Sequence, residues 1–421
     1  MKARAVYFIA LRYLLGRARE GGRYLRGAAA GIALSLIPIM VTLIVADGMI
    51  RGITERFLEL GTGHLQVHSY FDPSLVEWAL PRAAALEDVR GVWPERHGLG
   101  VLIGREGKAG TTIRAVDPSF LEDEGSRRYL TAVKGEKTLA SDRDVLLGEA
   151  LALSVGAEPG QTIRIMTVRT TDDGRNIPRM AAFTVRGIIS SGYRELDSLW
   201  CIMTYEAGKG VLAPEISSSY LMVKIRDPYR RIGGTARSLE DELGPAYGVY
   251  TWKELQRSQY SSYESTRQLL LFIMALIVLV AAVNVSSATS MLVIERQRDI
   301  AVLKAFGANP GGTGGIFLWS ALLTGLAGSF FGISLGLLIG NFINPIIRGL
   351  EAVLGFFSGL FNGGQVKILE SGYYLETIPV IIDWLAVFLI ALFTILCSVL
   401  SSWIPARRAG KLRPLELLRK Y

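Results

Sequence analysis

The spacing of long apolar segments constrains this sequence most strongly. Four segments are each long enough to cross about 30 Å of hydrocarbon as a helix that rises about 1.5 Å per residue. They span residues 28–50, 268–294, 316–343 and 379–404. Half of the residues are hydrophobic and only a fifth are charged, which is typical of a membrane protein. The sequence therefore predicts an integral membrane α-helical protein with four transmembrane helices.

The segments between the predicted spans define the rest of the organisation. Residues 51–267 contain no comparable apolar run and are long enough for one or two domains with their own cores, followed by a helical stalk. Short strand patterns alternate there with helix patterns, which predicts a large α+β domain divided into two subdomains. The remaining predicted segments are an amphipathic lead-in helix (1–27), a connector with a short helix (295–315), a loop with an interfacial helix (344–378) and a tail (405–421).

Basic residues at the span ends predict the orientation of the chain. They are frequent in the lead-in, connector and tail segments, whereas residues 344–378 carry only Arg348 and Lys367. Because lysine and arginine favour the cytoplasmic side, we expect both termini and the connector in the cytoplasm and the large domain outside. The net charge of +8 then follows from the span ends and requires no nucleic acid.

The connector contains the main group of candidate functional residues. It reads IERQRDIAVLKAFGA from Ile294 to Ala308 and has helical periodicity. Its apolar residues are Ile300, Val302, Leu303 and Phe306, and its polar residues include Glu295, Arg296, Arg298, Asp299 and Lys304. Such a helix cannot lie in hydrocarbon, so we expect it at the membrane surface, where it presents charged groups to a partner. This stretch by itself also allows an ordinary loop between spans.

Small and polar residues within the spans predict helix contacts. The third span carries Gly328, Gly332, Gly336 and Gly340, and small residues at this spacing let another helix approach closely. Asn284 in the second span either forms a hydrogen bond between helices or lines a cavity. Catalytic chemistry is not expected, because the sequence has no Walker A motif and no zinc-type cluster of cysteine and histidine.

Two motifs carry a family resemblance. The connector matches the pattern E-R-x-R-x-I-x-x-L-K-A-x-G-A, and the tail from Ile404 to Ala409, with Pro414, Glu416 and Leu418, looks like a family ending. The chain thus resembles ABC transporter permeases of the MacB/FtsX-like superfamily. The start FIALRYL, the stretch from Asp144 to Ile202 and the stalk TWKELQRSQYSSYES resemble the LolC/LolE type, and no ATPase domain is fused ahead of the first span. The main departure is the apolar insert from Pro345 to Phe361.

The resemblance implies a type VII ABC transporter permease in the bacterial inner membrane, without enzymatic activity of its own. ATP and Mg would be bound by a partner ATPase dimer, and a second permease, identical or paralogous, would complete the complex. The implied activity is extraction of lipoproteins from the outer leaflet and their transfer to a periplasmic carrier. The residues implied to couple to the ATPase are Glu295, Arg296, Arg298, Asp299, Ile300, Leu303, Lys304 and Phe306. The residues placed near an acyl-chain cavity are Pro38, Val41, Leu271 and Met274.

Two other functions remain open at this point. Within the same family, the chain would be a mechanotransmitting permease for peptide or drug export or for activation of a cell-wall hydrolase. In a different class, it would be a membrane-anchored receptor or enzyme with an external active site. The connector argues against the second alternative, because a receptor has no need of a partner-binding helix between spans.

Overall fold

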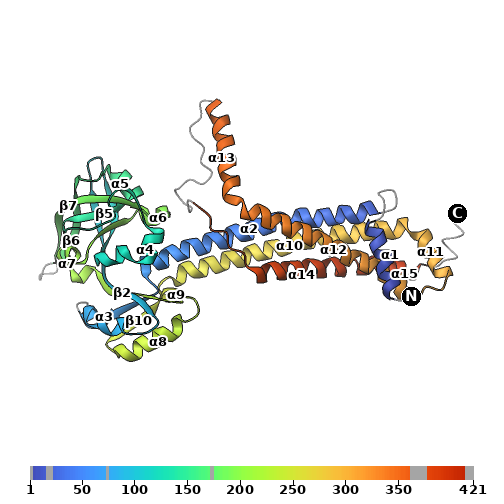
Figure 1. The fold of residues 1–421 in the computed structure, drawn as a ribbon, viewed down its shortest axis with the longest axis horizontal. Coiled ribbons are helices and arrows are strands. Elements are labelled where there is room, and N and C mark those ends of the chain that lie inside the picture. Colours follow the sequence, from blue (N-terminus) through green and yellow to red (C-terminus); the bar gives the residue numbers. More distant parts are fainter. Residues whose placement is uncertain (1–2, 16–21, 73–74, 171–174, 361–376, 413–421) are drawn as a thin grey trace. The chain divides into compact units, whose positions relative to one another are not determined.

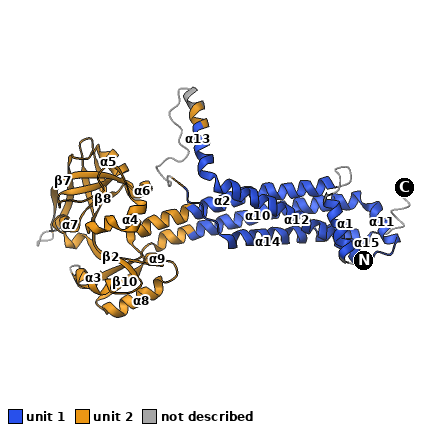
Figure 2. Ribbon diagram, in the orientation of Figure 1, with its two compact units in different colours: residues 1–48, 264–352, 378–421 blue, residues 49–263, 353–377 orange. Residues whose placement is uncertain are grey.

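The computed structural model describes residues 3–15, 22–72, 75–170, 175–360 and 377–412, which fall into two compact units. The first unit comprises residues 1–48, 264–352 and 378–421, and the second comprises residues 49–263 and 353–377 (Figure 2).

Helices build the first unit (Figure 1). In chain order they are α1 (Ala3–Leu15), α2 (Gly22–Arg56), α10 (Arg257–Glu295), α11 (Gln297–Ala305), α12 (Pro310–Asn341), α13 (Ile343–Leu360), α14 (Trp384–Ser401) and α15 (Trp403–Lys411). Of these, α2, α10 and α13 continue from the first unit into the second (Figure 2). Among the described residues, four helical stretches are long and apolar enough to cross a membrane, namely Gly22–Thr62, Arg257–Glu295, Pro310–Asn341 and Trp384–Lys411. The predicted four-helix membrane architecture is thereby confirmed.

Local sequence signals explain where several of these helices begin. The Asn309 side chain accepts a hydrogen bond from the Gly312 amide at the start of α12, and Asp383 accepts from Leu385 and Ala386 at the start of α14. The stretch TWKELQRSQYSSYESTRQLL contains no helix breaker, which predicts one continuous stalk helix into the second span, but Gln256 (φ −107°, ψ 27°) separates α9 (Trp252–Leu255) from α10.

The apolar insert forms the amphipathic helix α13. Ile346, Leu350 and Val353 are exposed at helical spacing along it, and within the described residues it is not one of the candidate spans. Phe361, the last residue of the predicted insert, lies outside the described residues. This agrees with an interfacial helix, whose location at the membrane stays a prediction.

The second unit is built on one sheet, which has ten strands within the described residues. The strands are β1 (Leu65–Ser69), β2 (Val89–Ile103), β3 (Lys108–Val116), β4 (Thr131–Gly135), β5 (Asp144–Gly148), β6 (Thr162–Thr170), β7 (Asn176–Ser190), β8 (Trp200–Thr204), β9 (Ser218–Ile225) and β10 (Tyr247–Thr251). Their order is β10-β1-β9-β2-β3-β8-β5-β7-β4, and β6 pairs with β2 and β7. The prediction of an α+β domain is confirmed. The division into two subdomains stays a prediction: the central region and its flanks have separate cores, although the hydrogen-bonded ladder of β2 with β3 and β9 continues through both regions.

Helices cover the sheet where its strands are most apolar. The helices and short turns of this unit are η2 (Phe57–Thr62), α3 (Val76–Ala84), η4 (Pro118–Glu122), α4 (Glu124–Tyr129), α5 (Glu149–Val155), α6 (Arg194–Asp197), α7 (Tyr205–Val211), η5 (Pro214–Ile216), α8 (Ile232–Leu243) and α9. One core joins α5 and α7 to β3, β5, β6, β7 and β8, and another joins α3 and α8 to β1, β9 and β10. A third core, around Leu60, Phe120 and Trp200, lies at the end of α2.

Candidate functional site

The connector folds as the short helix α11. A kink at Arg296 (φ −98°, ψ 19°) separates it from α10, and Gly307 ends it with a left-handed φ of 88°. The Ala308 amide then donates to the Leu303 carbonyl and closes the helix end. Glycine is required at position 307 because a side chain strains this backbone conformation. The predicted helix between the second and third spans is therefore present.

One face of α11 packs against its own chain. Ile300 is 1% exposed and lies in a core with Val6, Tyr13 and Phe317, and Leu303 packs against the same core. Ile300 and Leu303 are among the residues predicted to couple to a partner ATPase. Their apolar side chains instead pack inside the first unit, against residues of α1, α12 and α15.

Polar connector residues are also engaged within the chain. Arg296 pairs with Asp299 (Nη1–Oδ2 3.0 Å) and its guanidinium lies 5.1 Å from the centre of the Tyr13 ring. Burial raises the pKa of Tyr13 to about 12, with a further contribution from Asp299, so this ring remains uncharged beneath the arginine. Lys304 Nζ donates to the carbonyl oxygens of Gly410 (2.7 Å) and Leu412 (2.6 Å) at the end of α15. A cation at this position also interacts favourably with the helix dipole.

Four exposed residues form a stripe along the connector: Glu295, the last residue of α10, Arg298 and Val302 of α11, and Phe306 at the C-terminal cap of α11. Phe306 is 88% exposed and Val302 is 45% exposed, and Glu295 and Arg298 are exposed beside them. Arg298, Val302 and Phe306 are four residues apart, which places them on one side of α11, and Glu295 precedes them across the kink at Arg296. Val302 was not among the predicted coupling residues, although its spacing from Arg298 and Phe306 could have shown that it belongs with them. We call these four residues the outward stripe.

A cleft of about 380 Å³ lies close to the connector, between the start of α12 and α15. Its lining includes Pro310, Gly314, Trp403 and Arg407. The Arg407 guanidinium lies 4.7 Å from the centre of the Trp403 ring, which gives this part of the first unit a basic and aromatic surface.

The glycine repeat of α12 faces α2 within the first unit. A Cβ on Gly328, Gly332, Gly336 or Gly340 would come within 2.5 to 2.8 Å of side-chain atoms of Ile32, Leu36, Met40 and Ile44, respectively. Both helices thus contribute one residue every four positions to the same contact, and the structure brings all four predicted glycines together. Bulkier residues would force the two backbones apart.

An ion cluster that the sequence analysis missed joins three helices of the first unit. Arg267 of α10 contacts Asp47 of α2 (Nε–Oδ1 3.1 Å) and Asp383 at the start of α14 (Nη2–Oδ2 3.0 Å). The sequence could have indicated this cluster, because Asp47, Arg267 and Asp383 are opposite charges at the ends of three different predicted spans. Arg267 thereby links α10 to α2 and to the start of α14.

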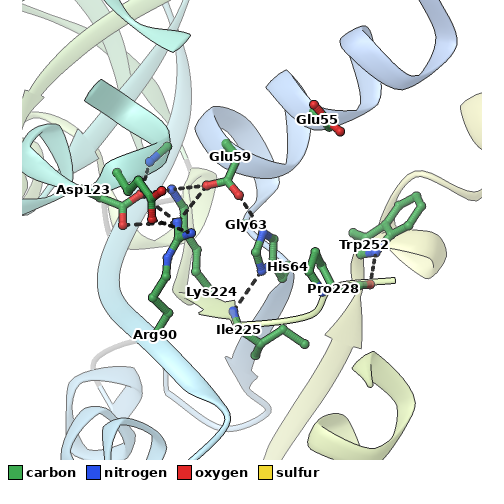
Figure 3. A network of polar contacts seen from close by, with 12 residues as sticks. Glu55, Glu59, Gly63, His64, Arg90, Asp123, Lys224, Ile225, Pro228 and Trp252 are labelled. Carbon is green, nitrogen blue, oxygen red and sulfur yellow. Dashed lines mark hydrogen bonds and ion pairs between the residues drawn. The ribbon is translucent and has the colours of Figure 1, made fainter. Parts of the chain in front are cut away.

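A second network lies in the second unit, around the end of α2 (Figure 3). Glu59 receives contacts from His64, Arg90 and Lys224. A polar cleft of about 360 Å³ lies beside it and is also lined by Arg51, Arg128 and Tyr229.

Comparisons with known proteins identify the family. A model of the FtsX-like permease C-terminal domain matches residues 271–414, and a model of the MacB-like periplasmic core domain matches residues 27–231. The chain is 27% identical to the lipoprotein-releasing system transmembrane protein LolC of Neisseria meningitidis serogroup B, with 98% of each chain covered. It is 22% identical to LolE of Haemophilus influenzae, with 99% of each chain covered. These matches support a permease of the LolC/LolE type.

A solved structure also resembles part of this LolC/LolE-type permease. The periplasmic region of MacB from Actinobacillus actinomycetemcomitans aligns with 48% of this chain and 95% of its own length, at 13% identity and a TM-score of 0.31.

The residues predicted near an acyl-chain cavity of this permease do not share one environment. Met274 is 5% exposed in the core between α2 and α10, whereas Leu271 is 39% exposed and Pro38 is also exposed. Val41 is half-buried. Asn284 is exposed on α10, so its side chain does not lie in a helix contact within this chain.

Proposed function

We propose that this permease releases lipoproteins from the outer leaflet of the bacterial inner membrane and passes them to a periplasmic carrier. The observation that carries this proposal is similarity over almost the full length to proteins named as lipoprotein-releasing system transmembrane proteins. The four candidate membrane spans support it, and so does the match of residues 27–231 to the MacB-like periplasmic core domain.

The energy for release would come from a separate ATPase dimer that binds ATP and Mg. Phe306 and Val302 give the outward stripe an apolar surface, and Glu295 and Arg298 supply charges at its N-terminal end. A short amphipathic helix of this kind suits a groove on a partner protein. In this arrangement the connector and both termini lie in the cytoplasm and the sheet lies in the periplasm, as the basic span ends favour.

The β6–β7 hairpin is a candidate surface for the carrier. Val168, Ile177 and Met180 are 40% to 52% exposed along these strands, which pair in antiparallel register. In this register Val168 and Met180 lie on one face of the hairpin and Ile177 lies on the other. Exposed apolar side chains on a hairpin are typical of a surface that another protein covers. A second permease, identical or paralogous, would complete the complex.

The proposal is tested by purifying the tagged chain from its native membranes and identifying the copurified proteins by mass spectrometry. We expect a stoichiometric ATPase and acylated lipoproteins, and reconstitution with both should give ATP-dependent transfer of lipoprotein to the carrier. An ATPase with a cell-wall hydrolase, or with an exported peptide in place of lipoproteins, would contradict the proposed cargo. Catalytic turnover by the second unit without any ATPase would contradict the transporter itself.

A further inference from the structure

The C-terminal end of α2 is a six-residue π-helix, η2, that is buried in the second unit. Helices of this type are rare and occur frequently at functional sites. Leu58 and Leu60 are 2% and 0% exposed, although they belong to different cores. Leu58 packs with the strands around β1 and β9, and Leu60 packs with Phe120 and Trp200. The end of α2 is therefore embedded in two cores at once.

Arg114 of β3 binds the backbone of η2 directly. Its Nη1 donates to the Leu60 carbonyl (2.5 Å) and its Nη2 donates to the Gly61 carbonyl (3.4 Å). Carbonyls at the end of a helix lack helical partners and ordinarily bind water. The guanidinium is held by Glu95 through two contacts (2.7 and 2.9 Å) and lies 4.5 Å from the centre of the Trp200 ring. Both charged side chains are almost fully buried, so water does not replace these contacts.

Glu59 links the side of η2 to three further segments (Figure 3). Its carboxylate lies 3.1 Å from Lys224 Nζ on β9, 2.9 Å from Arg90 Nη2 on β2 and 3.2 Å from His64 Nε2. His64 Nδ1 accepts a hydrogen bond from the Ile225 amide, so Nε2 carries the proton that faces Glu59. Lys224 is fully buried and also contacts Asp123 at 2.5 Å.

We propose that η2 is the joint through which movement of α2 reaches the sheet, with Arg114 and Glu59 as positioning residues. An ordinary helix end frays and transmits little force, because its last turn is free to move independently. Here both the terminal carbonyls and a side-chain carboxylate of the last turn bind buried cations on β3 and β9. A displacement of α2 therefore displaces these strands. The role of this movement in transport rests on the proposed function.

The first test measures hydrogen exchange of the full-length protein in nanodiscs, for the wild type and Glu59→Gln. In the wild type, the η2 amides are expected to exchange as slowly as those of β3, because the two open together. Glu59→Gln is expected to speed exchange in η2 by about tenfold while β6 and β7 remain protected. The matched control is Thr167→Val, which removes a buried hydrogen bond to the Val211 carbonyl far along the sheet. Rapid exchange of η2 in the wild type would overturn the proposal, whatever the protein transports.

The second test measures lipoprotein released per ATP hydrolysed by the reconstituted complex. Glu59→Gln and Arg114→Lys are expected to lower this ratio by about fivefold and to leave ATP hydrolysis within about twofold of the wild-type rate. A residue with only a structural role would lower both in proportion to the folded protein, and Thr167→Val should keep the ratio. Faster hydrogen exchange in η2 without a change in lipoprotein released per ATP hydrolysed would exclude transmission through this joint.

A wild-type complex that hydrolyses ATP without releasing lipoprotein would contradict the proposed cargo and not the joint. The joint is then judged from the change in hydrogen exchange between the nucleotide-free and ATP-bound complexes. Protection in β3 and β9 should respond to ATP in the wild type and lose that response in Glu59→Gln. The same response in both proteins would overturn the joint.

Discussion

Gly332 of α12 lies so close to Leu36 of α2 that a Cβ on the glycine would be 2.8 Å from the Leu36 Cβ. It would also be 2.9 Å from the backbone Cα of Ala33, so repacking of a side chain cannot relieve the overlap. Close contact of this kind provides dispersion energy in a lipid environment, where the hydrophobic effect does not hold helices together. The pairing of α2 with α12 therefore depends on residues without side chains.

Gly332→Ala should destabilise the first unit by about 1–3 kcal/mol, because the added methyl group overpacks the contact with α2. Unfolding in a detergent titration, followed by tryptophan fluorescence, measures the change. Gly31→Ala is the matched control, since a Cβ at Gly31 has no neighbour within 4 Å. Equal stability of the two variants would contradict close packing at Gly332.

Phe306→Asp should abolish copurification of the ATPase and leave the permease folded, because the side chain is exposed on the outward stripe. Ile300→Asp should instead destabilise the permease itself by about 3 kcal/mol or more, since it places an unpaired charge in a core. Copurification and thermal unfolding together distinguish the two effects. Leu99→Asp, at an exposed apolar residue of β2, serves as a control that should retain the ATPase. If Phe306→Asp still copurified with the ATPase, the outward stripe would not be the surface that binds it.

Lys304→Met should loosen α15, because the ammonium group donates to the carbonyl oxygens of Gly410 and Leu412. Loss of hydrogen bonds from a charged donor costs about 1.5–3 kcal/mol. Faster hydrogen exchange in residues 403–412 is the expected result. Lys411→Met changes an exposed lysine of the same helix and should leave exchange nearly as it is. Faster exchange in both variants would show that Lys304 has no specific role.

Acid should weaken the network around Glu59. Burial by itself raises the pKa of this carboxyl group, but the hydrogen bond from His64 and the charges of Lys224 and Arg90 lower it well below its usual range. A depressed pKa contributes stability that is present above the usual value of about 4.3 and is lost as pH falls through the folded-state pKa. Denaturant unfolding of the second unit should therefore become easier as the pH falls below about 5.

Glu59→Gln provides the control for this pH dependence. The variant should be less stable at neutral pH and should lose less further stability on acidification, because it has no carboxylate to protonate at this position. The free energy of unfolding at several pH values tests this expectation. Parallel pH profiles for the two proteins would show that other groups control acid unfolding.

Periodicity and motif spacing were enough to predict the membrane spans, the connector helix and the glycine contact. A span is an uninterrupted apolar run, and the glycine repeat of α12 specifies a close-packed helix face without reference to the partner. The sequence patterns TTIRAVD, QTIRIMTV and SYLMVKI predict strands, and they largely coincide with β3, β6 and β9. Local patterns did not reveal that these strands share one sheet, since pairing joins segments far apart in the chain.

Motif spacing was enough to identify the residues of the connector, but the packing of helices around it sets which of these residues are available to a partner. Ile300 and Phe306 are both apolar and lie in one short helix, yet Ile300 is buried against α1 and α12 and Phe306 is exposed. The contacts at η2 could not be predicted from the sequence either, because strand pairing brings Arg114 and Lys224 to η2 from distant parts of the chain. Periodicity along the chain records the hydrophobicity of one element, whereas burial of a given face depends on the elements that pack against it.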